Sequence, residues 1–404
     1  MKNKIFHTAI CLFRDKVARL RESDGYSVKN KIFHTAICLF RDKVARLRES
    51  DGYSVNVTDI FQQYGLDDLE QSVDILFPDW NLQIYELFQL IMTGNIGQVW
   101  EKVGKEFLTM AVGEIAGIKT VLVIILILGI VSGILSNFSD LFENHQVADI
   151  AFYINYIILI ILLMEIFSNT LQVAENTLME LVEFVQFFLP TYFLTITAAN
   201  GGTTAITYYQ LMLFVVFFVE RVLYTIFVPS VSCFMMLVIL NGIWEEEKLT
   251  AMLTMVKKGI SALLKGMVVF VMGIGMIQSM IAPVIDSLKT TAVEKTVTAI
   301  PGIGDLAGGA WQMVFTTAVL VKNSAGLLMM ILLIVLCGLP LLKLFCIMVM
   351  LKGGAGFIGL IADKRMTESV NKVGDGVALL LQIVFTANVF FMILIAVAAC
   401  TINR

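Results

Sequence analysis

Long apolar runs dominate the chain after residue 117 and predict helices that cross a membrane. One crossing of the hydrocarbon needs about 20 mostly apolar residues. The run at 206–243 is too long for one crossing, and Glu220, Arg221 and Pro229 divide it, which predicts one crossing plus a re-entrant or interfacial piece. The predicted crossings are 118–138, 150–171, 184–200, one within 206–243, 266–285, 325–345 and 377–400. The pattern predicts an all-α, polytopic integral membrane helix bundle with about seven spanning helices and additional amphipathic interfacial helices.

The first 55 residues are a perfect tandem duplication, with the same 27-residue segment at 2–28 and 29–55. Each copy fits one basic amphipathic helix, which could lie on an anionic membrane surface. Because the copies are identical, a recent duplication or an artefact at the start of the gene model explains them better than an old structural repeat. We expect this arm to be incidental to function.

Residues 56–117 are acidic and predict two short amphipathic helices. Pro78 breaks the pattern between them, and the second helix ends near Gly94. The segment has too little apolar surface for a core of its own, so we expect it to pack on the bundle. The third domain is then the transmembrane region, 118–404.

Composition agrees with the membrane class and excludes several others. The chain is 58% hydrophobic and 15% charged, with a mean hydropathy of +0.83, whereas soluble chains carry about 25% charged residues. No sustained basic patch indicates nucleic acid as a partner. The six cysteines form no C-x-x-C pair, so no disulfide framework, metal site or other cofactor is predicted. A G-x-G-x-x-G match at 354–359 lacks a βαβ context, and no catalytic constellation indicates an enzyme.

Lysines and arginines are distributed unequally among the segments between the predicted crossings. The segments 244–265 and 352–372 are rich in lysine, whereas 139–149 contains neither lysine nor arginine. Because short cytoplasmic loops carry an excess of Lys and Arg, the first two are expected in the cytoplasm and the third outside.

Residues 246–267 form the clearest amphipathic pattern in the chain. Apolar residues such as Leu253 and Ile260 share one face, while Lys257, Lys258 and Lys265 share the other. Two interpretations remain open. The helix is either a connector lying among lipid headgroups or a partner-binding helix.

A second internal repeat aligns 302–319 with 372–389 without gaps, and seven of the eighteen positions are identical. In each copy a Gly-Asp pair is predicted to open an apolar helix, where the Asp would accept hydrogen bonds from free N–H groups. The functional alternative is a pair of related half-units with a pathway between them, as in many transporters.

Charged residues within apolar runs are further candidates, because charge at membrane depth is often functional. Glu165, Glu220 and Arg221 are the intramembrane polar candidates. Those near helix ends could instead extend to the membrane surface.

The stretch 291–326 resembles the signature region of the stage III sporulation protein AE family. The resemblance covers roughly 57–404 and is carried mainly by IPGIGD at 300–305, by KNSAG at 322–326, and by the final VGDG. Combined with the repeat, the candidate motif residues are Pro301, Gly302, Gly304, Asp305, Gln312, Lys322, Asn323, Gly374, Asp375 and Gln382.

The resemblance implies a mother-cell membrane protein at the engulfed forespore. Family members are expected in a channel-like complex that joins the two cells, with ring-forming secretion-like subunits and a forespore partner, and that supports late forespore transcription. We expect this chain to act there as a conduit or an assembly platform, in contact with membrane lipid. A secondary transporter of a small solute and a non-transporting scaffold are the alternatives. No cofactor is implied, and the oligomeric state is not predicted.

Overall fold

The computed structural model describes residues 83–139, 145–200, 202–243, 249–297, 304–360 and 364–401, and every regular element in them is helical. The elements are α5 (Ile84–Met92), α6 (Ile96–Ser139), α7 (His145–Asn200), α8 (Gly202–Val222), the π-helical turn η1 (Leu223–Phe227), α9 (Val228–Ile243), α10 (Thr250–Val297), α11 (Gly304–Ile358) and α12 (Lys364–Thr401). Helices suit apolar sequence in lipid because they satisfy the backbone hydrogen bonds within one segment. The predicted all-α bundle is confirmed.

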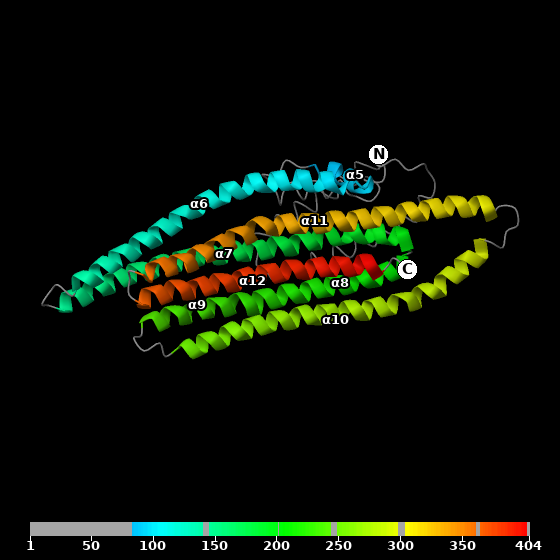
Figure 1. Cartoon of the computed structure of the whole chain (residues 1–404). Coiled ribbons are helices and arrows are strands. Elements are labelled where there is room, and N and C mark those ends of the chain that lie inside the picture. Colours follow the sequence, from blue (N-terminus) through cyan, green and yellow to red (C-terminus); the bar gives the residue numbers. More distant parts are fainter. Residues whose placement is uncertain are drawn as a thin grey trace, which may run out of the picture.

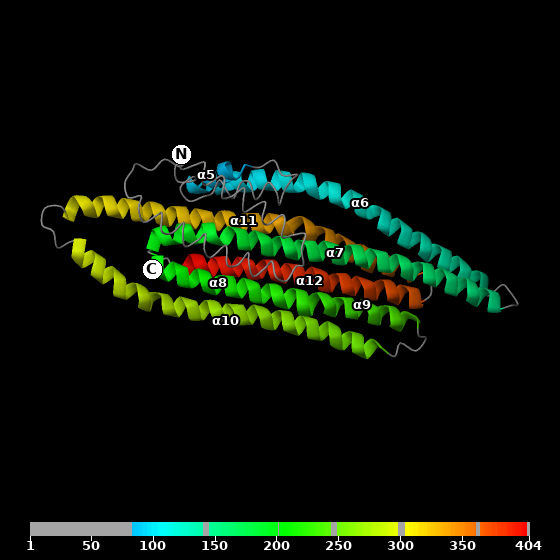
Figure 2. The same ribbon diagram turned by 180° about the vertical axis from the view of Figure 1, so that it is seen from behind.

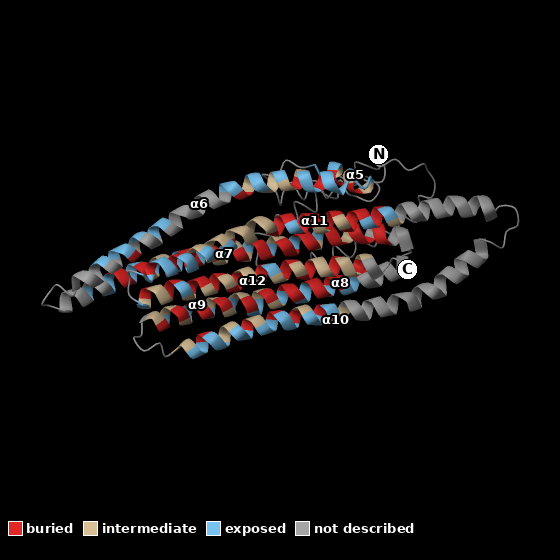
Figure 3. Ribbon diagram, viewed as in Figure 1, coloured by how far each residue is buried: buried red, intermediate tan, exposed pale blue. Residues whose placement is uncertain are grey.

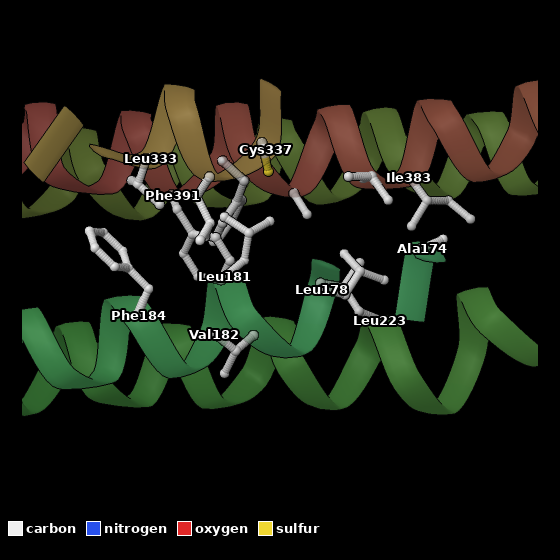
Figure 4. Close-up of a cluster of buried hydrophobic side chains, with 14 of the residues drawn as sticks. Ala174, Leu178, Leu181, Val182, Phe184, Leu223, Leu333, Cys337, Ile383 and Phe391 are labelled. Atoms are coloured by element: carbon white, nitrogen blue, oxygen red, sulfur yellow. The ribbon is translucent and has the colours of Figure 1, made fainter. Parts of the chain in front are cut away.

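The long helices lie side by side as an elongated bundle (Figures 1 and 2). α7, α11 and α12 pack against one another and carry many of its buried residues (Figure 3). Apolar side chains from these three helices and η1 meet there, including Leu181, Leu223, Leu333, Ile383 and Phe391 (Figure 4). Such contacts pack the helices against one another, since lipid tails alone give no hydrophobic drive between them.

Four helical stretches in the described residues are long and apolar enough to cross a membrane. They are Tyr153–Phe193, Tyr209–Gly242, Val319–Ile358 and Lys364–Ala399. The chain is therefore a membrane protein by length and composition, whereas the predicted count of about seven crossings is not confirmed.

The helices are longer and fewer than the apolar runs predicted. The runs 150–171 and 184–200, expected as separate crossings, belong to the uninterrupted α7, which continues through Pro190. The polar stretch between them consists mostly of good helix formers, so it does not break the helix. In the same way, the amphipathic segment from residue 250 onward and the run 266–285 both lie in α10.

The expected re-entrant piece within 206–243 is wrong. Residues 202–243 are helical throughout, as α8, η1 and α9. The π-helical turn ends two residues before Pro229. A proline ring clashes with the carbonyl four residues earlier in a regular helix, and a π-turn widens the helix at that point. The proline is thus accommodated without ending the helix.

This continuity also changes which segments share an end of the bundle. α6 ends and α7 begins at the same end where α9 ends, α10 begins and α11 connects to α12 (Figure 1). We call this the lysine-rich end, after Lys257, Lys258, Lys352, Lys364 and Lys372. The expectation that 139–149 lies opposite the two lysine-rich segments is wrong, because α7 traverses the bundle once where two crossings were predicted.

The short helix α5 agrees with its sequence prediction. It ends at Met92, and Gly94 follows with a φ of 77°, a left-handed conformation that glycine adopts without strain. Its buried face, including Leu87 and Phe88, packs against α11. α6 then runs without a break through residue 117. The duplicated arm at 1–55 and the first acidic helix lie outside the described residues.

Candidate functional site

A cleft of about 620 Å³ lies at the lysine-rich end, bordered by α9, α10 and α12. Phe234 of α9 and Leu253 of α10 form its apolar wall. Its polar lining is Thr250, Thr254, Lys257, Lys258, Ser261, Lys265, Asn371, Lys372 and Asp375. Four lysines against one aspartate make this cleft cationic.

Helical spacing explains why these side chains gather. On α10 the polar residues recur at intervals of three or four from Thr250 to Lys265, which places them along one side of the helix. The neighbouring apolar stripe, with Leu253, Ile260 and Leu264 all buried, holds that side against the bundle. α12 adds Asn371, Lys372 and Asp375 over a single turn.

Asp375 joins three helices through two ion pairs. Its Oδ2 lies 2.9 Å from Nζ of Lys257 on α10, and its Oδ1 lies 2.7 Å from Nζ of Lys352 on α11. The lysine side chains are each 42% exposed and the Asp375 side chain is 23% exposed. Pairs this exposed are screened by solvent and contribute well under 1 kcal/mol each by the usual range. They fix position more than they add stability.

Two neighbouring contacts set the spacing of the helices around Asp375. Ser261 Oγ of α10 donates to Gln382 Oε1 of α12 over 3.1 Å. At Gly374, a Cβ atom would lie 3.1 Å from Cγ of Lys352, so the glycine permits the close approach of α12 to α11. Two features found separately in the sequence, the amphipathic segment and the second repeat copy, therefore meet in one site.

The remaining lysines of the cleft differ in their partners. Lys372 lies 3.3 Å from Glu368, one turn earlier on α12. Lys258 and Lys265 have exposed side chains and, within the part of the chain that is described, no ion-pair partner. They are the cations most available to a bound anion.

The prediction that Asp375 opens a helix is wrong. α12 begins at Lys364, so Asp375 lies about three turns inside it and pairs with lysines instead of backbone N–H groups. In the first repeat copy, Gly304 does begin α11 and Asp305 follows it. The side chains of Asp305 and Gln312, and the whole of Pro301 and Gly302, lie outside the described residues.

Lys322 belongs to a different part of the bundle. Its side chain is fully buried on α11, and its Nζ donates to the carbonyl of Ala399 over 3.4 Å. Ala399 lies in the last turn of α12, where carbonyls lack partners within the helix and a cation suits the negative end of the helix dipole. Asn323 is exposed. Lys322 therefore acts on the end of α12 and not on the cleft.

The intramembrane polar candidates Glu165, Glu220 and Arg221 do not converge on the cleft either. Glu220 is buried beside the π-helical turn and accepts a hydrogen bond from Gln186 Nε2 over 3.2 Å. Glu165 and Arg221 are exposed. No group of three His, Cys, Asp or Glu side chains suited to a metal occurs among the described residues.

Sequence reasoning missed the contribution of Lys352 and Lys372 to this site. In the sequence both count only as charges of a connecting segment. A signal for them was present in the sequence. The connecting segment and 244–265 are both rich in lysine, so both are expected on the same side of the membrane and could have been considered together.

An all-helical bundle with four apolar helices of membrane-spanning length defines an integral membrane protein with a cationic cleft at one end. The chain belongs to the stage III sporulation protein AE family, whose model matches residues 82–401. This confirms the resemblance drawn from the signature region and assigns the protein to sporulation. The family is not one of known enzymes.

One curated relative is the stage III sporulation protein AE of Bacillus subtilis (strain 168). The two are 24% identical over 237 residues, which is 58% of this chain and 59% of the relative. The match thus spans about three fifths of the relative's length. No solved structure matches the chain significantly.

Proposed function

We propose that this protein is a membrane subunit of a channel-like complex that links mother cell and forespore and sustains late forespore gene expression. Membership of the stage III sporulation protein AE family, over 82–401, is the observation that carries the proposal. The four apolar helices support a location in a membrane, which we take to be the mother-cell membrane around the forespore. The lysine-rich end then faces the mother-cell cytoplasm, by the excess of positive charge.

The packing of the described bundle favours a platform over a pore through one subunit. Leu181, Leu333 and Phe391 fill the space between α7, α11 and α12 (Figure 4). Protein interiors packed in this way contain few voids larger than a water molecule. In this proposal, ring-forming subunits and a forespore partner assemble on the bundle, and the conduit is formed between subunits.

The test is deletion of the gene in its own spore-forming host, with a late forespore transcription reporter read after engulfment. We expect normal engulfment, a reporter that then fails, and recovery when the full gene is returned, but not with the empty vector. Normal spores and a normal reporter in the deletion strain would refute the proposal.

Platform and transporter differ in a second measurement. A tagged full-length chain that replaces the native gene should retain other stage III sporulation proteins after mild solubilisation during sporulation. Retention of none of them, together with solute uptake by vesicles that contain only this protein, would favour the small-solute transporter instead.

A further inference from the structure

We propose that the lysine-lined cleft binds the headgroup of an anionic phospholipid, with the acyl chains lying along the exposed apolar flank of α10. The ligand class follows from the charge, the size and the surroundings of the cleft. The inference does not depend on the channel proposal, because it concerns a property of the isolated protein in a membrane.

Charge favours an anion carrying phosphate. Four lysines and Asp375 give the lining a net charge of +3, and Glu368, which pairs with Lys372 from outside the lining, reduces this to +2. Each ammonium presents three donors from a mobile stem, which suits the oxygens of a phosphate group. The amide of Asn371 offers a further donor beside them.

The cleft is larger than a single small anion requires. Its volume of about 620 Å³ falls within the range of roughly 300–1,000 Å³ found for sites of small organic ligands. A phosphate with its glycerol and headgroup substituent would occupy such a space. The apolar wall formed by Phe234 and Leu253 would contact the first carbons of the acyl chains.

The exposed surface of α10 is apolar beyond the lysines, which favours a lipid as the ligand. At 3.6 residues per turn, Met255 lies about 60° from Lys258 around the helix, whereas Met252 and Leu263 lie about 120–140° from it. Met252, Met255 and Leu263 have side chains 51%, 78% and 55% exposed. A helix with lysines on one side and such residues on the next lies at a membrane interface, with ammonium groups at the level of the lipid phosphates. Basic pockets between membrane helices on the cytoplasmic side commonly hold anionic headgroups. A free anion would gain nothing from this apolar flank.

Asp375 acts as an internal competitor for the ligand. It occupies Lys257 at 2.9 Å and Lys352 at 2.7 Å, so these two cations are only partly available. Replacing it by the neutral Asn removes the competing charge while preserving the size of the side chain. Lipid binding should therefore tighten in Asp375→Asn, whereas loss of a lysine should weaken it. If these residues had only a structural role, the two kinds of substitution would not change lipid affinity in opposite directions.

The experiment uses the full chain in nanodiscs of neutral phosphatidylcholine, titrated with short-chain phosphatidylglycerol. The double variant Lys258→Gln/Lys265→Gln removes the two lysines that have no described partner. Its matched control, Lys102→Gln/Lys105→Gln, removes two lysines of α6 that lie outside the cleft and pair with Glu86 and Glu101. Thermal unfolding of each variant identifies any that are misfolded.

We expect affinity to fall roughly fivefold per cleft lysine, or about 25-fold for the double variant, and to rise several-fold in Asp375→Asn. The control should bind like the wild type, and added salt should weaken all binding. Equal affinity in the two double variants would overturn the proposal, as would equal binding of short-chain phosphatidylcholine.

Two competition arms distinguish the sources of the anion. Inorganic phosphate that displaces phosphatidylglycerol at equal concentration would show an ion site and overturn the lipid assignment. A polyglutamate peptide is the second competitor. If it displaces the lipid, binds more tightly than the lipid and loses affinity in Lys258→Gln/Lys265→Gln, the cleft is assigned to an acidic protein segment instead. Failure of both competitors supports the lipid. If Asp375→Asn misfolds, the single variants Lys258→Gln and Lys265→Gln still decide the outcome.

Discussion

Gly242, near the end of α9, lies where α7, α9 and α12 pack closely and gives a sharp test of that packing. A Cβ atom at this position would overlap Oη of Tyr156 on α7 and lie 2.9 Å from Oγ of Ser369 on α12. Tyr156 and Ser369 are each only 5% exposed, and their hydroxyl groups are hydrogen-bonded over 3.0 Å. Gly242→Ala therefore forces a buried, rigid ring to move.

Opposing effects determine the size of the change in stability. Alanine gains about 0.5–1 kcal/mol over glycine inside a helix. Overpacking a core typically costs about 1–3 kcal/mol, and separating two buried hydroxyl groups costs about 1–3 kcal/mol when neither finds a new partner. Taken together, these effects should make Gly242→Ala lower the free energy of unfolding by about 1–5 kcal/mol.

The measurement is equilibrium unfolding of the purified full chain in bicelles by titration with a denaturing detergent. Gly104→Ala on α6 is the matched control, because a Cβ there meets no atom within 4 Å. This variant should gain up to about 1 kcal/mol from helix propensity. Tyr156→Phe removes the overlapped oxygen, so it should restore part of the loss when combined with Gly242→Ala.

Either of two results would refute the reasoning. If Gly242→Ala is as stable as Gly104→Ala, then α7, α9 and α12 are not packed as described. Additive losses in the double variant Gly242→Ala/Tyr156→Phe would mean that the two residues are not in contact, since neighbours show a coupling energy and distant sites do not.

Two further substitutions probe the buried and the half-exposed charges. Lys322→Met should leave the free energy of unfolding unchanged or raise it, because replacing a buried charge by an apolar residue of similar size is often neutral or stabilising. A loss above about 1 kcal/mol in the same titration would show that the polar contacts of Lys322, among them the hydrogen bond to Ala399, dominate. Asp375→Asn should cost no more than about 1 kcal/mol, since both partner lysines are substantially exposed. Its difference from the wild type should shrink at high salt, and a loss that is unaffected by salt would contradict an electrostatic origin.

Local sequence determined the class of the protein and several element ends. Apolar runs of about 20 residues require helices in lipid, whatever their neighbours are. Gly94 ends α5 because its left-handed backbone is a property of one residue. Helical spacing likewise predicted the lysine-bearing side of 246–267. The signature region was sufficient to identify the family.

The tertiary structure alone decided how many apolar runs form one helix and which charges meet. Hydropathy reports the solvent preference of each residue, so the polar stretch before residue 184 indicates a break although α7 continues through it. That continuity moves the start of α7 to the lysine-rich end (Figure 1). Asp375, with the local signature of a helix cap, instead pairs with Lys257 and Lys352, which are 118 and 23 residues away in the sequence. Partners this distant are set by the packing of whole helices, which no local pattern encodes.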